Sequence, residues 1–252
     1  MQKKIKREFQ EFFVLLKSVP PVLLSLFVLS IVLMNLLANK SINIPLDWLA
    51  LDCGIIVSWL TFLTMDVLTK HFGPKAATEI SLFALCVNLL VCLLLFAASV
   101  IPGSWGESFN YAESGAVNGA LNNTFGGTWY VVLGSSAAFA VSAVINNFLN
   151  FAVGKAFRKK PDGFGAYVCR TYVSTAAAQF ADNLIFALIV SHFFFGWSVT
   201  QCVTCAAAGM VVELLCELVF ARVGFVICRK WKNENVGEKY FLLKENNAGE
   251  KE

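Results

Sequence analysis

Six long apolar stretches constrain this chain more than any other feature of its sequence. They cover residues 22–38, 49–69, 80–101, 129–151, 171–195 and 201–228. An apolar helix needs roughly 20 residues to cross the ~30 Å hydrocarbon core of a bilayer. Because lipid offers no hydrogen-bond partners, each backbone amide of such a stretch must be paired within its own segment. The sequence therefore predicts an all-α, polytopic membrane protein with six transmembrane helices.

Basic residues lie beside alternate ends of these stretches, which predicts the orientation of the chain. They are Lys3, Lys4, Lys6, Arg7 and Lys17 before the first stretch, Lys70 and Lys75 in the second loop, Lys155, Arg158, Lys159, Lys160 and Arg170 in and beside the fourth loop, and Arg229, Lys230, Lys232, Lys239, Lys244 and Lys251 in the tail. The intervening loops hold only Lys40. Since basic loops stay on the cytoplasmic side, both termini are predicted to be cytoplasmic. The net charge of +3 is thus a topological signal, and no nucleic-acid partner is expected.

Three regions follow from this pattern. Residues 1–21 form an N-terminal arm in which aromatic and aliphatic residues recur at helical spacing among charges, as expected for a helix lying in the inner interface. Residues 22–228 form the transmembrane domain, and residues 229–252 are predicted to be a solvated, polar cytoplasmic tail. Within the domain, residues 102–128 are rich in Gly, Asn and Ser and are predicted to be a non-helical outer loop, either a connector or a lid.

Several classes of function lack their signatures in this sequence. There is no Gly-Lys-Ser/Thr phosphate loop, no His-Glu-x-x-His and no Gly-x-Ser-x-Gly, so an ATPase or a hydrolase of those types is unsupported. Cys202 and Cys205 have CxxC spacing, but no second pair accompanies them. The eight cysteines are interpreted as small packing residues, and neither a metal nor a cofactor is expected.

The fifth stretch carries the most informative polar residues. Gln179, Asp182 and Asn183 are spaced i, i+3, i+4 and share one helical face. Counting from Arg170 at ~1.5 Å per residue, Asp182 lies about 18 Å along the helix, near the bilayer midplane. Transporters place substrates at this depth. Interhelical hydrogen bonding is the alternative, but a carboxylate is a costly choice for it.

Two other stretches hold candidate groups. In the sixth, Glu213 and Glu217 are spaced i, i+4, so one of them is either protonated, as proton coupling requires, or paired with Arg222 or Arg170. In the fourth, Asn146, Asn147 and Asn150 lie close together. Their amides either hydrogen-bond to a heterocyclic ligand or join neighbouring helices. In the second, Asp66 and Lys70 form an i, i+4 pair at a helix end.

Two of these runs resemble signatures of the vitamin uptake transporter family, also called the queuosine precursor transporter family. The first is MDVLTKHFG at 65–73, with Asp66 before an aromatic-Gly pair, and the second is RTYVSTAAAQFADNLIF at 170–186. The second matches the family in Arg170, Ser174, Gln179, Asp182 and Phe186. The chain departs from the family at Asn147 and Asn150, where Gln and Asp are usual, and at Glu213, where Lys is common.

The resemblance implies a bacterial inner-membrane protein that imports a deazapurine, such as 7-cyano- or 7-aminomethyl-7-deazaguanine. The substrate-binding residues it implies, together with the polar groups above, are Asp182, Gln179, Asn183, Phe186, Asn147, Asn150, Asp66 and Arg170, with Glu213 and Glu217 as candidates for proton coupling. Two alternatives remain open. One is a substrate-binding subunit of an energy-coupling-factor importer, whose partner would be a coupling ATPase module. The other is an intramembrane enzyme or a purely structural protein.

Overall fold

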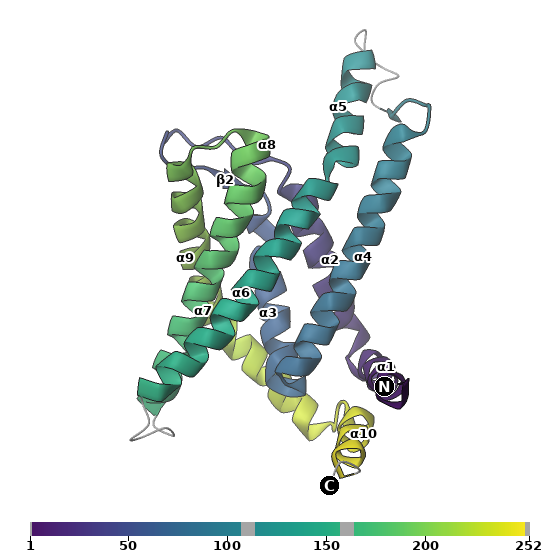
Figure 1. The fold of residues 1–252 in the computed structure, drawn as a ribbon, viewed down its shortest axis with the longest axis vertical. Coiled ribbons are helices and arrows are strands. Elements are labelled where there is room, and N and C mark those ends of the chain that lie inside the picture. Colours follow the sequence, from purple (N-terminus) through teal and green to yellow (C-terminus); the bar gives the residue numbers. More distant parts are fainter. Residues whose placement is uncertain (1, 107–113, 157–163, 250–252) are drawn as a thin grey trace. The chain divides into compact units, whose positions relative to one another are not determined.

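The computed structural model describes residues 2–106, 114–156 and 164–249 of the 252-residue chain. For residues 2–4, 114, 143, 144, 146–156, 164–172, 174, 217, 221, 248 and 249 it describes the backbone alone. The elements, drawn in Figure 1, are α1 (Gln2–Ser18), α2 (Pro21–Leu37), β1 (Ser41–Ile42), β2 (Leu51–Asp52), α3 (Ile55–Phe72), α4 (Pro74–Val100), α5 (Ser114–Gly127), α6 (Trp129–Ala156), α7 (Phe164–Phe186), the π-helix η2 (Ala187–His192), α8 (Phe193–Phe195), α9 (Val199–Asn233) and α10 (Glu238–Gly249). The all-α fold class is confirmed.

Each predicted apolar stretch is a helix. α2, α3, α4, α6 and α9 correspond to the first, second, third, fourth and sixth stretches, and α7, η2 and α8 together form the fifth. Pro21 and Pro74 occupy the first positions of α2 and α4, where the missing N–H costs no helical hydrogen bond. Between α3 and α4, Gly73 adopts φ +90, a left-handed conformation that suits glycine at a helix end.

The helix of the second stretch begins later than predicted. Residues before Ile55 form a short antiparallel hairpin in which Ser41 pairs with Asp52 and Ile42 pairs with Leu51. The Asp52 carboxylate accepts a hydrogen bond from the backbone N–H of Gly54 at 2.8 Å, directly before α3. Asp52 therefore lies outside the helical span, although the apolar stretch was predicted to begin at residue 49.

Four helical segments in the described part of the chain are long and apolar enough to cross a membrane. They are Ile55–Phe72, Pro74–Val100, Thr175–Phe195 and Val199–Phe220. A fifth candidate joins Ile5–Ser18 to Pro21–Leu37, two segments that meet at an angle of 103°. These helices make the chain a multi-pass membrane protein by length and composition. The number of six spans and the cytoplasmic position of the termini stay predictions.

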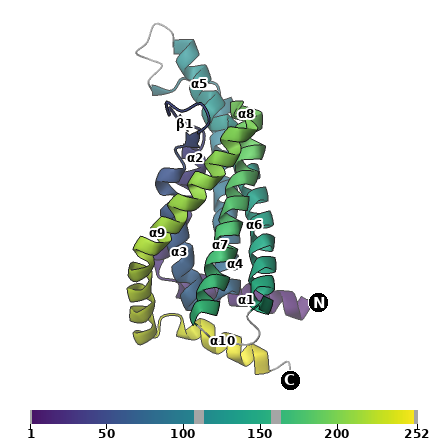
Figure 2. The ribbon, with the colours of Figure 1, turned by 90° about the vertical axis from the view of Figure 1, so that its left-hand side faces the viewer.

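The chain divides into two compact units. Unit 1 comprises Met1–Val32, Val57–Asn88 and Cys216–Glu252, and unit 2 comprises Leu33–Ile56 and Leu89–Leu215. In unit 2, α6 and α7 run side by side (Figures 1 and 2). α6 also approaches η2 closely at Gly134, where an added Cβ would clash with the Val190 side chain of η2.

Unit 1 has one apolar core, to which the C-terminal segment contributes. Its buried members are Leu15, Val19, Leu23, Phe27, Val67, Leu68, Phe72, Ala76, Ala77, Ile80, Ala84, Trp231 and Tyr240. The predicted tail is solvated only in part, because residues after Asn233 turn back into α10, where Tyr240 is only 1 % exposed. Val236 accepts a hydrogen bond from the His71 ring at 2.9 Å, and Phe241 stacks on Phe72 with centroids 5.8 Å apart.

Residues 102–128 also differ from expectation. Their second half forms α5, so the prediction of a non-helical loop is wrong for Ser114–Gly127. The side chain of Asn118 caps the preceding segment by accepting a hydrogen bond from the Trp105 backbone N–H at 2.9 Å. Asn122 accepts a second bond from the Trp105 ring at 2.8 Å. The polar residues that suggested a loop therefore hold α5 against the chain that precedes it.

Candidate functional site

One face of α7 carries three polar side chains inside an apolar helix. Gln179, Asp182 and Asn183 follow the helical spacing predicted for them, and Gln179 is 5 % exposed. Asp182 and Asn183 are half-buried. After Phe186 the helix widens into η2, which continues to His192. This face belongs to unit 2, whose helices α6 and α9 supply its partners.

The Asp182 carboxylate is bound by a hydroxyl of the neighbouring helix. Ser142 of α6, which is 8 % exposed, donates a hydrogen bond from Oγ to Asp182 Oδ1 at 2.9 Å. A hydrogen bond to a charged group contributes about 1.5–3 kcal/mol. This bond fixes the carboxylate between α6 and α7.

A second carboxylate is bound from the adjacent residue of α7. Asn183 Nδ2 donates a hydrogen bond to Glu213 Oε2 of α9 at 3.2 Å, and Glu213 is 3 % exposed. The contact depends on Gly209, one turn before Glu213 on α9. An added Cβ at Gly209 would lie 2.7 Å from Asn183 Nδ2. Glycine at this position therefore lets the amide lie against α9.

The two carboxylates thus accept hydrogen bonds from neutral donors on two neighbouring helices. Arg222, one basic partner predicted for Glu213, is exposed and lies nine residues further along α9, about 13 Å along the axis. Placing a charged side chain at the centre of a membrane helix costs roughly 2.5–3.5 kcal/mol on insertion scales. A buried and a half-buried acidic group, held by a hydroxyl and an amide, are therefore suited to bind a polar ligand or to exchange a proton.

Phe186 lies one turn beyond Asp182 on the same helix. It is half-buried and packs against an apolar cluster of unit 2 formed by Ala38, Val131 and Val190. This packing is a structural role, and the substrate-binding role predicted for Phe186 stays a prediction.

Several predicted site residues lie outside what the structure describes. The side chains of Asn147, Asn150, Arg170 and Glu217 are among them. Asp66 is described, but it belongs to α3 in unit 1. There it forms the predicted i, i+4 ion pair with Lys70 at 2.7 Å, and its side chain is 44 % exposed. A substrate role for Asp66 stays a prediction.

Sequence reasoning missed two residues of this site. Ser142 is spaced i, i+4, i+8 with Asn146 and Asn150, so the predicted amide face of the fourth stretch extends to it. The signal was present, but a lone serine in an apolar helix is common. Gly209 has no polar side chain to mark it in the sequence, and its specific contact with Asn183 needed the structure.

The described residues show no group of three or more His, Cys, Asp or Glu side chains arranged to hold a metal ion. The cysteines whose state the structure gives are free thiols, and Cys202 is buried within an apolar cluster of unit 2.

Comparison with protein families gives one match. The model of the family described as "Putative vitamin uptake transporter" matches residues 52–227. No curated protein and no solved structure matches the chain. The matched segment covers well over half of the chain and contains the polar face of α7 together with both of its helical partners, α6 and the α9 residues Gly209 and Glu213. The chain therefore belongs to the vitamin uptake transporter family.

Proposed function

We propose that this protein imports a queuosine precursor, 7-cyano- or 7-aminomethyl-7-deazaguanine, across the bacterial cytoplasmic membrane by proton-coupled secondary transport. Membership of a transporter family supports uptake of a small vitamin-like molecule. We infer the substrate class from the polar face of α7, where the Asp182 carboxylate and the Gln179 amide lie one turn apart.

A guanine-like ring suits these groups. Its ring N–H and exocyclic amine are adjacent donors, which a carboxylate can accept, and its lactam oxygen can accept from an amide N–H. The Ser142 hydroxyl binds one oxygen of Asp182, Oδ1, and a carboxylate has about four acceptor positions. In this proposal, Asp182 binds the donor edge of the ring and Gln179 binds the lactam oxygen.

Glu213 is the proposed coupling group. It is the more buried of the two carboxylates, and its hydrogen bond to Asn183 links it to the residue next to Asp182. Proton relays inside membranes use acidic residues placed in this way. Protonation of Glu213 would remove the negative charge that holds the Asn183 amide. The resulting shift of Asn183 would change the position of Asp182, the neighbouring residue that binds the substrate.

The test uses bacterial cells that can neither make the precursor nor import it. The protein is expressed there with low external precursor, and queuosine in tRNA is measured. We expect the natural chain to restore queuosine and Asp182→Asn to reduce initial uptake at least tenfold, because an amide cannot replace a two-oxygen acceptor. Asp47→Asn is the matched control, since Asp47 is an exposed acid of the same unit.

Absence of queuosine with the natural chain present and folded in the membrane would overturn the substrate assignment. Equal uptake by Asp182→Asn would overturn the site. Glu213→Gln keeps an acceptor oxygen for Asn183, so we expect substrate binding to persist while uptake loses its response to an imposed proton gradient. The same assay in cells without any coupling ATPase module separates secondary transport, which persists there, from the energy-coupling-factor alternative, which fails.

A further inference from the structure

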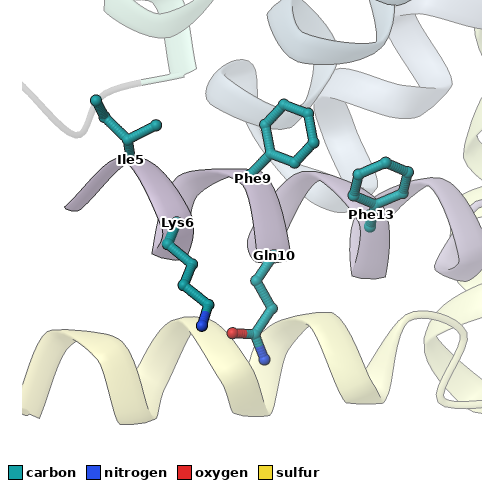
Figure 3. Close-up of a pocket in the computed structure, with 5 residues that line it drawn as sticks. All are labelled: Ile5, Lys6, Phe9, Gln10 and Phe13. Atoms are coloured by element: carbon teal, nitrogen blue, oxygen red, sulfur yellow. The ribbon is translucent and has the colours of Figure 1, made fainter. Parts of the chain in front are cut away.

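Helix α1 exposes an apolar stripe that the described chain does not cover. Ile5, Phe9 and Phe13 follow one another at spacings of four residues, and they are 57 %, 62 % and 49 % exposed. Together with Lys6 and Gln10 they line a shallow hollow of about 520 Å³ on the helix surface (Figure 3). Three large apolar side chains in one row would be unusual on a water-facing helix.

The face of α1 opposite the stripe packs within unit 1. Leu15 is fully buried in the core, and Glu11 is 8 % exposed. Glu11 accepts a hydrogen bond from Asn247 of α10 at 2.6 Å and another from Lys75 of α4 at 3.3 Å. Figure 3 shows α10 on the side to which Lys6 and Gln10 point, with Phe9 and Phe13 on the other side of α1. The stripe is therefore the face of α1 that remains for a partner outside the described chain.

The direction of α1 identifies the surface that this face meets. Its axis makes an angle of 103° with that of α2, which is predominantly apolar. If α2 crosses the membrane, α1 must run nearly parallel to the membrane plane. A helix in that position places an apolar face at the boundary between headgroups and acyl chains.

Charge beside the stripe indicates the kind of lipid. Lys6 lines the same hollow as the stripe, and Lys17, eleven residues or about three helical turns later, lies on the same edge of α1. Long basic side chains can bury their stems along apolar surface while their charged ends reach phosphate groups. Basic segments at the cytoplasmic surface of a membrane attract anionic lipids.

We propose that α1 is an in-plane lipid-binding helix of this protein. Ile5, Phe9 and Phe13 insert among acyl chains of the inner leaflet, and Lys6 and Lys17 bind anionic phospholipid headgroups. α10 holds α1 from the opposite side through the Glu11–Asn247 hydrogen bond. This inference concerns unit 1 and is independent of the substrate proposed above.

Photo-crosslinking in the full-length protein tests the occupant of the stripe. Benzoylphenylalanine replaces Phe9 or Phe13 in cell membranes, and Phe12, whose ring lies 6.1 Å from that of Phe83 in α4, is the matched control position. After irradiation we expect phospholipid adducts at the first two positions and adducts within the chain at the third. Adducts from position 9 or 13 to another protein, or to a second copy of the chain, would overturn the proposal.

Membranes of different lipid composition test whether Lys6 and Lys17 bind anionic headgroups. Thermal unfolding is measured in nanodiscs of phosphatidylcholine with and without phosphatidylglycerol. We expect the anionic lipid to raise the Tm of the natural chain by about 2–4 °C. The double variant Lys6→Gln/Lys17→Gln should lose this rise, whereas Lys232→Gln/Lys239→Gln, which removes two exposed bases elsewhere in unit 1, should keep it. An equal rise in both double variants would overturn the headgroup assignment.

Discussion

At the scale of single residues, the candidate site depends on neighbours that a helical pattern only partly reveals. The spacing of Gln179, Asp182 and Asn183 predicts that they share a face, because helical geometry is local. Their partners Ser142 and Glu213 lie 40 and 30 residues away in sequence, on other helices. Which helices pack together follows from the whole fold, so the sequence alone predicts the polar face and not the bonds that it makes.

Gly209 gives a test of this site by a small change. In Gly209→Ala the new Cβ would meet Asn183 Nδ2 at 2.7 Å, so we expect the Asn183–Glu213 bond to break and initial uptake to fall by roughly tenfold, equivalent to ~1.4 kcal/mol. Gly119→Ala on α5 is the control, since nothing lies within 4 Å of its Cβ. Alanine favours helix over glycine by about 1 kcal/mol, so thermal stability should not fall in the control. Undiminished uptake by Gly209→Ala would show that the amide contact is not needed.

At the scale of elements, long apolar helices were predictable and short polar ones were not. Six stretches of sufficient length identify their own helices, because backbone amides in lipid have no other partners. α5 and α10 have compositions typical of loops and tails. α10 is held by contacts far apart in sequence, such as the stacking of Phe72 on Phe241 and the hydrogen bond between His71 and Val236. α5 is held by the hydrogen bonds of Asn118 and Asn122 to Trp105. No local pattern records such contacts.

The contact between α1 and α10 should depend on pH through Glu11. Burial raises the pKa of Glu11, but hydrogen bonds from Asn247 and Lys75 and the charges of Lys75 and Arg7 outweigh it, so the pKa lies below its ordinary value of 4.5. A lowered carboxyl pKa stabilises the folded state above the unfolded pKa and stops doing so as pH falls through the folded one. We therefore expect α10 to stay docked from pH 7 to 5 and to loosen below about pH 4.

Amide hydrogen exchange of α10, corrected for its intrinsic pH dependence, measures this effect. Glu11→Gln should exchange faster than the natural chain at pH 7, because it lacks the charge that Asn247 and Lys75 bind. Glu234→Gln is the control, since Glu234 is an exposed acid that pairs only weakly with Lys230 at 3.8 Å. Protection of α10 that is unchanged in Glu11→Gln would show that apolar contacts alone hold it.

At the scale of the whole molecule, the distribution of charge predicts what helix geometry leaves open, namely the side of the membrane on which each loop lies. The basic residues gather in the two termini and in the second and fourth loops, and residues 102–128 have none. Under the positive-inside rule, six spans then place both termini inside and α5 outside. Unit 1 supports this order independently, because α1, α10 and the corner between α3 and α4 pack together, as expected if all of them lie on one side.

Reporter fusions test this topology directly. A fluorescent protein that folds only in the cytoplasm should fluoresce when fused after Glu252, and alkaline phosphatase, which needs the outer side, should be inactive there. The same phosphatase inserted after Gly119 of α5 should be active, and inserted in 157–163 it should be inactive, because bases flank that segment. Activity in 157–163 would reverse the fourth and fifth spans. It would also place α7 with Asp182 in the opposite direction, so that substrate would reach the Asn183–Glu213 pair from the other side of the membrane.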